Sequence, residues 1–225
     1  MNVPVSQKSP NKGHEIYEES LHIIESLLKG NCRFSANYSE AEKAVVRRVI
    51  HATSDINYAE TVFFTNNSAE KSISLINEKI SKREPLKIVC DSEMTKAGIS
   101  RNTNGNIILD IDCRIGFGYK PADAETTVSA FSIRAAISES LPDIIIVGNA
   151  PTALEESMKL CRRLYESINY KPILIIGMPV GFVGAAESKM RLYNDEFFNA
   201  IGNFGNFGGS APAASAMNAL LRESL

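Results

Sequence analysis

The chain has 225 residues, of which 44% are hydrophobic and 22% charged, as in an ordinary soluble domain with one sizeable core. The 24 Lys and Arg residues against 26 Asp and Glu residues give a formal charge of −2, which excludes a broad basic surface for nucleic acid. No run approaches the ~20 apolar residues of a membrane span, and the first residues lack the apolar stretch of a secretory signal. We therefore expect a cytoplasmic protein.

The first part of the chain is predicted to be mainly helical. Residues 1–13 are polar and expected to be mobile. Apolar residues recur at helical spacing over 15–28 and 40–51, and again over 67–82, after a short strand at 61–65.

Strands and helices then alternate. Strands are predicted at 86–91, 106–112, 143–149 and 172–179, and helices at 92–99, 123–139, 150–169, 183–199 and 209–225. The run D-I-I-I-V-G-N at 143–149 is typical of a strand buried on both faces of a parallel sheet. The alternation indicates a single domain over 1–225, with a three-layer α/β/α fold and a mostly parallel, Rossmann-like sheet.

The cysteines carry no recognisable metal or redox motif. They are Cys32, Cys90, Cys113 and Cys161, far apart and without a CxxC pair. Reduced thiols are the favoured interpretation, with two disulfides as the alternative. No second histidine or cysteine stands at ligand spacing from a histidine, so no bound zinc is expected.

Ligands of such sheets bind at the carboxyl ends of the strands. This rule directs attention to the segments 91–95, 148–152, 177–187 and 202–210. In G-N-A-P-T-A-L at 148–154, Asn149 is a candidate N-cap and Pro151 suits a first helical turn. A well-capped helix explains this segment, and its free N–H groups equally suit a carboxylate or a polar ring substituent.

The segment G-M-P-V-G-F-V-G at 177–184 allows a flat ligand to approach the backbone closely. Its glycine spacing matches neither of the common nucleotide-binding motifs. Glu187 and Lys189 follow it, as Asp91 and Lys96 follow the strand at 86–91. The plainer interpretation of these charges is a solvated helix surface, with Asp91 as a cap.

The most informative histidine is His51, in R-R-V-I-H-A-T-S-D at 47–55. Its position near a helix C-terminus is explained by the helix dipole. The functional alternative is a general acid, since imidazole holds and delivers a proton near neutral pH. His14 and His22 lie in the N-terminal region, where exposure is expected.

Four segments together resemble the precorrin-8X methylmutase family of vitamin B12 (cobalamin) biosynthesis. They are R-V-I-H-A-T at 48–53, D-S-E-M-T-K-A-G-I at 91–99, G-N-A-P-T-A-L at 148–154 and G-M-P-V-G-F-V-G-A-A-E-S-K at 177–189. G-G-S at 208–210 before an alanine-rich last helix also matches, so the resemblance spans nearly the whole chain.

The resemblance implies a homodimeric isomerase without a cofactor of its own. Its substrate is a contracted tetrapyrrole rich in carboxylates, with cobalt or without it, and a methyl group moves from C-11 to C-12 to give cobyrinate or hydrogenobyrinate. The matching proton donor is His51, and neighbouring cations would lower its pKa while substrate carboxylates would raise it. The implied substrate contacts are Ser20, Arg48, Thr53, Asp91, Met94, Lys96, Gly98, Arg134, Asn149, Ala150, Thr152, Gly181, Phe182, Val183, Glu187, Lys189, Gly208, Gly209 and Ser210.

The chain departs from the family at 202–210. The family's R-G-R-x-G-G-S is replaced by G-N-F-G-N-F-G-G-S, without either arginine. We expect the N–H groups of residues 208–210 to accept a carboxylate instead, and Phe204 and Phe207 to pack on the macrocycle. Asn203→Arg is expected to be tolerated. Near the N-terminus only Ser20 carries over from an arginine-serine pair, and Arg134 stands in a shifted context.

Three other functions remain open at this point. A nucleotide-dependent enzyme predicts binding of NAD or S-adenosylmethionine. A non-catalytic tetrapyrrole carrier predicts binding without turnover. A nucleic-acid binder using Phe204 and Phe207 for stacking lacks arginines around them.

Overall fold

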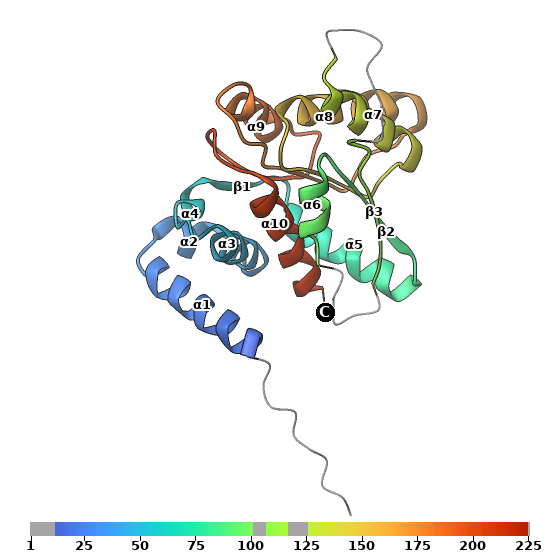
Figure 1. The fold of residues 1–225 in the computed structure, drawn as a ribbon. Helices are drawn as coiled ribbons and strands as arrows, with labels where there is room; N and C mark the ends of the chain where they lie inside the picture. Colours follow the sequence, from blue (N-terminus) through green and yellow to red (C-terminus); the bar gives the residue numbers. More distant parts are fainter. Residues whose placement is uncertain (1–11, 101–106, 117–125, 225) are drawn as a thin grey trace, which may run out of the picture.

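The computed structural model describes residues 12–100, 107–116 and 126–224, and within them one six-stranded sheet lies between two layers of helices (Figure 1). The strand order is β1-β6-β5-β4-β2-β3, with β1 antiparallel to β6 and the other neighbours parallel. The strands are β1 (Val62–Phe64), β2 (Pro85–Cys90), β3 (Ile108–Asp112), β4 (Ile144–Val147), β5 (Leu174–Gly177) and β6 (Ala200–Asn203). This confirms the predicted α/β class with a mostly parallel sheet.

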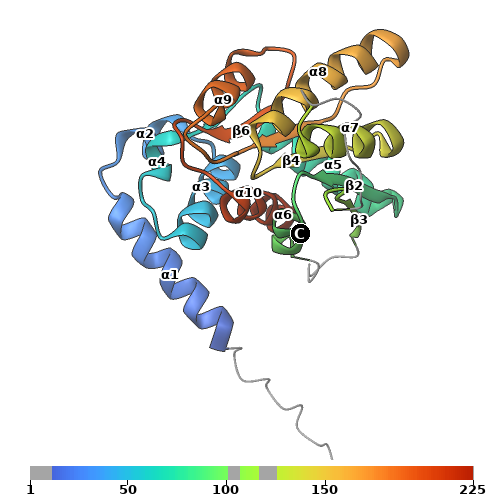
Figure 2. The ribbon, with the colours of Figure 1, turned by 45° about the horizontal axis from the view of Figure 1, so that its top comes forward.

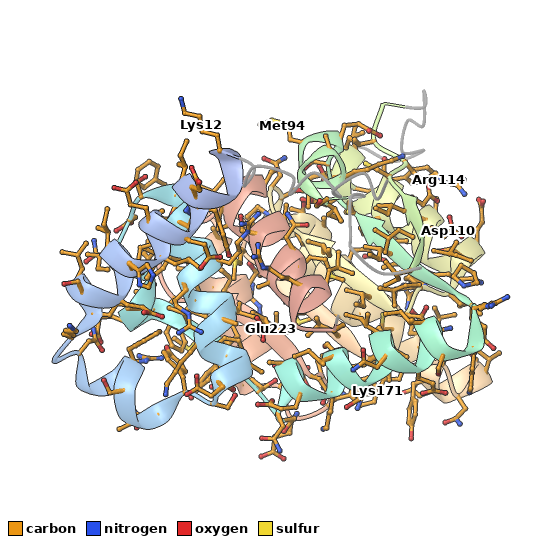
Figure 3. The ribbon with its side chains drawn as sticks, turned by 90° about the horizontal axis from the view of Figure 1, so that it is seen from below. Lys12, Met94, Asp110, Arg114, Lys171 and Glu223 are labelled. Carbon is orange, nitrogen blue, oxygen red and sulfur yellow. The ribbon has the colours of Figure 1, made fainter. Side chains whose placement is uncertain are left out.

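One helical layer covers each face of the sheet. In Figure 1, α7, α8 and α9 lie above the sheet, and α1, α3, α5 and α10 lie below it. The helices are α1 (Lys12–Leu28), α2 (Cys32–Asn37), α3 (Glu40–Thr53), α4 (Tyr58–Thr61), α5 (Ser68–Lys82), α6 (Glu93–Gly98), α7 (Val128–Ser140), α8 (Pro151–Ile168), α9 (Ala185–Asn194) and α10 (Ser210–Glu223). Figure 3 shows α10 in the middle of the lower layer, between α1 and α3 on one side and α5 and α6 on the other.

The central strands explain why two layers are needed. Every residue of β4 and β5 is buried, and alternate side chains enter opposite cores. Ile144 and Ile146 face the core with α3 and α10, whereas Ile145 and Val147 face the core with α7 and α8. Both faces are therefore apolar and both need a helical cover.

Local signals in the sequence set several helix boundaries. Ser39 and Glu42 form a reciprocal capping box at the start of α3, and Ser54 closes that helix in a left-handed conformation. Thr127 caps α7, so this helix begins later than the predicted residue 123, although 117–125 lie outside the described residues. Most of the predicted mobile segment, residues 1–11, also lies outside them, while Lys12 and Gly13 belong to α1.

The prediction missed three short elements, namely α2, α4 and β6. Residues 183–199 are not one helix, because α9 ends at Asn194 and β6 begins at Ala200. Four residues with the sequence A-I-G-N carry no period of their own. They form a strand because β5 and β1 offer hydrogen bonds on both sides.

Cys90, Cys113 and Cys161 are buried free thiols, and burial raises the pKa of each of them. Among the helices within the described ranges, none is long and apolar enough to cross a membrane.

Candidate functional site

His51 lies near the end of α3, where α1 covers it. Its Nδ1 atom is 2.8 Å from Oγ of Ser20, and its ring meets the ring of Tyr17 edge-on, with centroids 5.0 Å apart. Both partners come from α1, in which Tyr17, Ser20 and Ile24 lie on the inward face. The Ser20 hydroxyl can donate to a neutral ring or accept from a charged one, so it fixes the ring in either state.

The surroundings of His51 favour its neutral form. Partial burial lowers its pKa first, and the positive charge of Arg48, one helical turn earlier, lowers it further. A bound anion near Arg48 would act in the opposite direction. The histidine is thus placed where an anionic ligand increases its tendency to hold a proton.

A cavity of about 150 Å³ lies next to Tyr17 and is rich in cations. The guanidinium groups of Arg48 and Arg222 lie 4.9 and 4.4 Å from the centroid of the Tyr17 ring. Arg47 pairs with Glu25 at 3.1 Å, and Arg222 lies 3.6 Å from a Glu18 oxygen. The cavity is lined by Tyr17, Glu18, Leu21, Ala44, Arg47, Arg48, Ala219, Arg222 and Glu223.

At the carboxyl edge of the sheet, Asp91 organises the loop that follows β4. Its carboxylate accepts the backbone N–H groups of Gly148, Asn149 and Ala150 at 2.8–3.0 Å. The side chain is 3% exposed, and burial raises its pKa against the opposing effect of these hydrogen bonds. The expected substrate contact by Asp91 is therefore wrong, since its oxygens hold the loop.

The start of α8 also differs from the prediction. The N-cap is Ala150 rather than Asn149, and Pro151 occupies the first turn as expected. The Asn149 side chain is exposed and makes no hydrogen bond to another described residue, so it is free for a ligand. Thr152 is exposed too, and its hydroxyl accepts from Thr127 at 2.8 Å.

Three hydroxyl groups meet where α6 and α10 begin. Ser210 Oγ lies 3.1 Å from Ser92 Oγ and 2.9 Å from Thr95 Oγ1, and the latter two are 2.8 Å apart. Gly148 lies against this cluster, because a Cβ there would be 2.7 Å from Thr95 Oγ1. Ser210 is thus tied into a hydroxyl cluster that joins two loops of the edge.

The loops after β5 and β6 are bonded to each other through their backbones. Gly209 N–H donates to Met178 O at 2.8 Å, and Gly181 N–H donates to Asn206 O at 3.0 Å. The Gly209 N–H is therefore not available for a carboxylate, which corrects one of the three donors expected at residues 208–210. Phe182 and Val183 project from the first loop and are 93% and 88% exposed, so they remain open to a ligand or a partner.

The two phenylalanines of the second loop are anchors. Phe204 packs on Phe63 and Tyr193, with ring centroids 4.9 and 5.0 Å away, and Phe207 packs on Tyr58 at 5.2 Å. They enter opposite sides of the sheet, so the expected packing of both on a macrocycle is wrong.

Two further predictions about charges fail at buried positions. Asn203 is fully buried and donates to the carbonyls of Phe204 and Phe207, so an arginine there would not be tolerated. Lys189 is 0% exposed, so it is neither a solvated surface residue nor a direct substrate contact. Glu187, two residues earlier, is exposed as expected.

Other predicted contacts are spread over the molecule. Met94 is exposed at the outer side of α6, as Figure 3 shows, and Lys96 is half-buried on the same helix. Gly98 packs on α10, because a Cβ there would be 2.8 Å from that of Ala214. Thr53 donates its hydroxyl to Val49 O at 2.8 Å within α3.

Arg134 does not join the same group as His51. It lies on α7 in the upper layer, where its guanidinium donates to Glu156 at 2.7 Å. It lines a separate cavity of about 370 Å³ with Thr127 and Thr152. The structure therefore places Arg134 apart from His51, and its substrate contact stays a prediction.

α10 runs from the hydroxyl cluster at the carboxyl edge to the cavity beside Tyr17. It begins at the carboxyl edge with Ser210, and its later residues Ala219 and Arg222 line the cavity beside Tyr17 and Arg48. Sequence reasoning missed Tyr17 and Arg222, as well as Ser92 and Thr95. Ser92 and Thr95 could have been found from their S-x-x-T spacing directly after a strand. No sequence signal indicates that α1 meets α10, so Tyr17 and Arg222 could not have been found.

No group of three or more His, Cys, Asp or Glu side chains able to hold a metal ion occurs among the residues placed in the structure. Polar groups open to a ligand include the partly exposed His51 ring and the exposed Asn149 amide.

Fold and site together define an α/β protein with a candidate acid-base histidine near Arg48. A glycine-rich sheet edge lies at the opposite end of α10. The family model for precorrin-8X methylmutase matches residues 15–223. A cobalt-precorrin-8 methylmutase of Methanocaldococcus jannaschii is 34% identical over 93% of both chains, and a precorrin-8X methylmutase of Sinorhizobium is 30% identical over 95% of this chain and 96% of the relative. The solved precorrin-8X methylmutase of Thermus thermophilus is 27% identical, with a TM-score of 0.71 over 93% of this chain and 96% of that one. The chain belongs to the precorrin-8X methylmutase family.

Proposed function

We propose that the protein is a methylmutase that moves a methyl group from C-11 to C-12 of precorrin-8X or its cobalt form, giving hydrogenobyrinate or cobyrinate. The observation that carries the proposal is the placement of His51. Within a family of methylmutases, it is held by Ser20 at 2.8 Å and lies near Arg48, whose positive charge suits a substrate with many carboxylates.

The reaction fits the groups that the site offers. A methyl shift within one molecule needs a fixed conformation and a proton that rearranges the conjugation of the macrocycle. His51 would deliver that proton from its Nε2 atom, since Nδ1 is engaged by Ser20, and would take a proton back once the methyl group has moved, so that the product is an isomer of the substrate. An isomerisation imports no group and transfers no net electrons, so we propose that the protein needs no cofactor of its own.

The site also allows proton uptake when the substrate binds. Substrate carboxylates near Arg48 would offset the positive charge that lowers the pKa of His51. Binding would then protonate the histidine, and the proton would be present when the methyl group moves. Calorimetry in buffers of different ionisation enthalpy would detect this uptake.

We also propose that the protein is a homodimer. Ile16, Ile23 and Leu27 are 57%, 55% and 66% exposed, and their spacing of seven and four residues puts them on one side of α1. Figure 2 shows α1 on the outside of the molecule, beyond α3. A second copy would cover this apolar face. Light scattering should give twice the monomer mass, and Ile23→Asp should reduce it.

Incubation with each substrate form tests the proposed reaction. The methyl shift changes the conjugation of the macrocycle, so the visible spectrum should change with time at catalytic amounts of protein. Six similar relatives are named cobalt-precorrin-8 methylmutase and two precorrin-8X methylmutase, which favours the cobalt form as the faster substrate. Binding with no spectral change for either form would instead identify a carrier.

A further inference from the structure

Lys189 is a buried cation on α9. It is 0% exposed, and no carboxylate of the described residues pairs with it. Its Nζ atom donates to the carbonyl oxygen of Phe207 at 2.6 Å and lies 5.9 Å from the Phe207 ring centroid. All of its recorded polar contacts thus go to one residue of the loop after β6.

Burying an ammonium group is unfavourable, so an apolar side chain would suit this position better if filling space were its only role. Burial alone lowers the pKa of Lys189 to about 8. Because the side chain is covered, no ligand reaches the amine and a nucleophilic role is excluded. The remaining role is the charge-assisted hydrogen bond to the loop.

The Phe207 carbonyl is the centre of a small buried network. Asn203 Nδ2 donates to the same oxygen at 2.8 Å and to Phe204 O at 3.1 Å. Two donors from different elements, α9 and the end of β6, therefore converge on one backbone oxygen. The Asn203 Oδ1 atom is also buried, and it has no hydrogen-bond partner among the residues that the structure describes.

The residues that follow Phe207 depend on this orientation. Gly208 lies so close to the other loop that a Cβ would be 2.3 Å from Met178 O. Gly209 donates to that same oxygen at 2.8 Å, and Ser210 begins α10. A turn of the Phe207 peptide would displace all three residues together.

We propose that Lys189 is a positioning residue: its ammonium group holds the Phe207 carbonyl inward, and this fixes the two loops of the carboxyl edge, the edge at which sheets of this kind bind their ligands. The inference rests on the proposed function for its effect on substrate, but the effect on the loops stands without it. Lys189 itself does not touch the ligand.

The first test is Lys189→Met, which keeps the length of the side chain and removes its donor. Lys82→Met on the exposed end of α5 is the matched control, since it removes the same charge outside the site. Amide exchange of Gly181 and Gly209, whose N–H groups join the two loops, should become about tenfold faster in Lys189→Met only. In turnover, KM should rise about tenfold while kcat stays within about threefold, as expected when binding rather than chemistry is impaired.

Two further variants keep the proposal testable if Lys189→Met does not fold. Lys189→Gln retains a neutral donor and should give an intermediate exchange rate and KM. Asn203→Ala removes the second donor and should change both in the same direction as Lys189→Met. The proposal is overturned if these variants lower the melting temperature but leave the exchange of Gly181 and Gly209 and the KM of the folded protein as in wild type. Lack of turnover by the wild type would refute the proposed function, whereas amide exchange would still decide the role of Lys189.

Discussion

The loops at the carboxyl edge of the sheet and the histidine at the end of α3 are held by different kinds of contact. The loops are joined by backbone hydrogen bonds, by the Asp91 carboxylate and by the buried donors of Lys189 and Asn203. His51 is instead held by one hydroxyl and one ring edge of α1.

This difference separates two tasks. Loops held by many hydrogen bonds bind a ligand without further ordering, so little conformational entropy would be lost on binding of the proposed substrate. A histidine with an adjustable environment can change its protonation when an anion binds. We therefore expect changes in the loops to affect affinity, and changes around His51 to affect the chemical step.

The largest effect is expected for His51→Ala. Loss of a general acid typically lowers the rate by ~10²–10⁴-fold, while the loops of the carboxyl edge, which are predicted to bind the ligand, remain as they are. Turnover should fall by that factor, with the dissociation constant of the product close to the wild-type value. His22→Ala, at an exposed position of α1, is the control. Turnover within about threefold of wild type would remove His51 from the mechanism.

The next largest effect is expected for Gly208→Val. A side chain there would meet the Met178 carbonyl at 2.3 Å and break the bond from Gly209 to that oxygen. Product affinity should fall by about 100-fold, equal to roughly 2.8 kcal/mol, as measured by fluorescence or absorbance titration. Gly30→Ala is the control, because its φ of +89° is also positive but nothing lies within 4 Å. If Gly208→Val lowers only the melting temperature, the loop closes the fold without meeting substrate.

The loops and the histidine also differ in how much of their structure could be predicted from the sequence. Glycine-rich segments after apolar runs correctly indicated where strands end, because buried parallel strands have a continuous apolar sequence. The contacts within these loops were not predictable. Lys189 reads as a surface charge at the start of a helix, and only the tertiary structure shows that its ammonium group is covered.

For His51, the sequence indicated the residue itself but not all of its neighbours. The family resemblance implied a general acid with cations beside it, and in the structure burial and, to a lesser degree, Arg48 lower the pKa of His51. Tyr17 and Arg222 were missed because α1 and α10 come from opposite ends of the chain. No local pattern in a single sequence reports such a meeting.

A smaller effect is expected for Ser20→Ala. The ring of His51 would lose the hydroxyl at 2.8 Å that fixes its orientation but would keep its edge contact with Tyr17. We expect kcat to fall by about tenfold with little change in KM, because the ring still reaches the substrate but less often in the correct orientation. Ser26→Ala, on the exposed side of α1, should have no effect. A rise in KM alone would show that Ser20 contacts substrate instead.

The smallest effect concerns the pH profile. A general acid is active when protonated, and the pKa of free His51 lies below its ordinary value of 6.5 because of burial and Arg48. The profile of kcat/KM, which reports the free protein, should therefore fall as pH rises through a pKa below 6.5. The profile of kcat reports the complex, in which substrate carboxylates offset Arg48, so its fall should come at higher pH.

Arg48→Gln sharpens this prediction, because it removes the second cause of the shift and leaves burial, the first, in place. The pKa of His51 in the free protein should move up toward 6.5 without reaching it, and the gap between the two profiles should narrow. NMR titration of the imidazole C–H signal, assigned with His51→Ala, measures the pKa directly. Arg47→Gln is the control, since Arg47 is paired with Glu25 and does not contribute to the shift. If Arg48→Gln left the pKa of His51 unchanged, the charge of Arg48 would not control the protonation of the histidine. A substrate carboxylate near Arg48 could then not raise that pKa on binding.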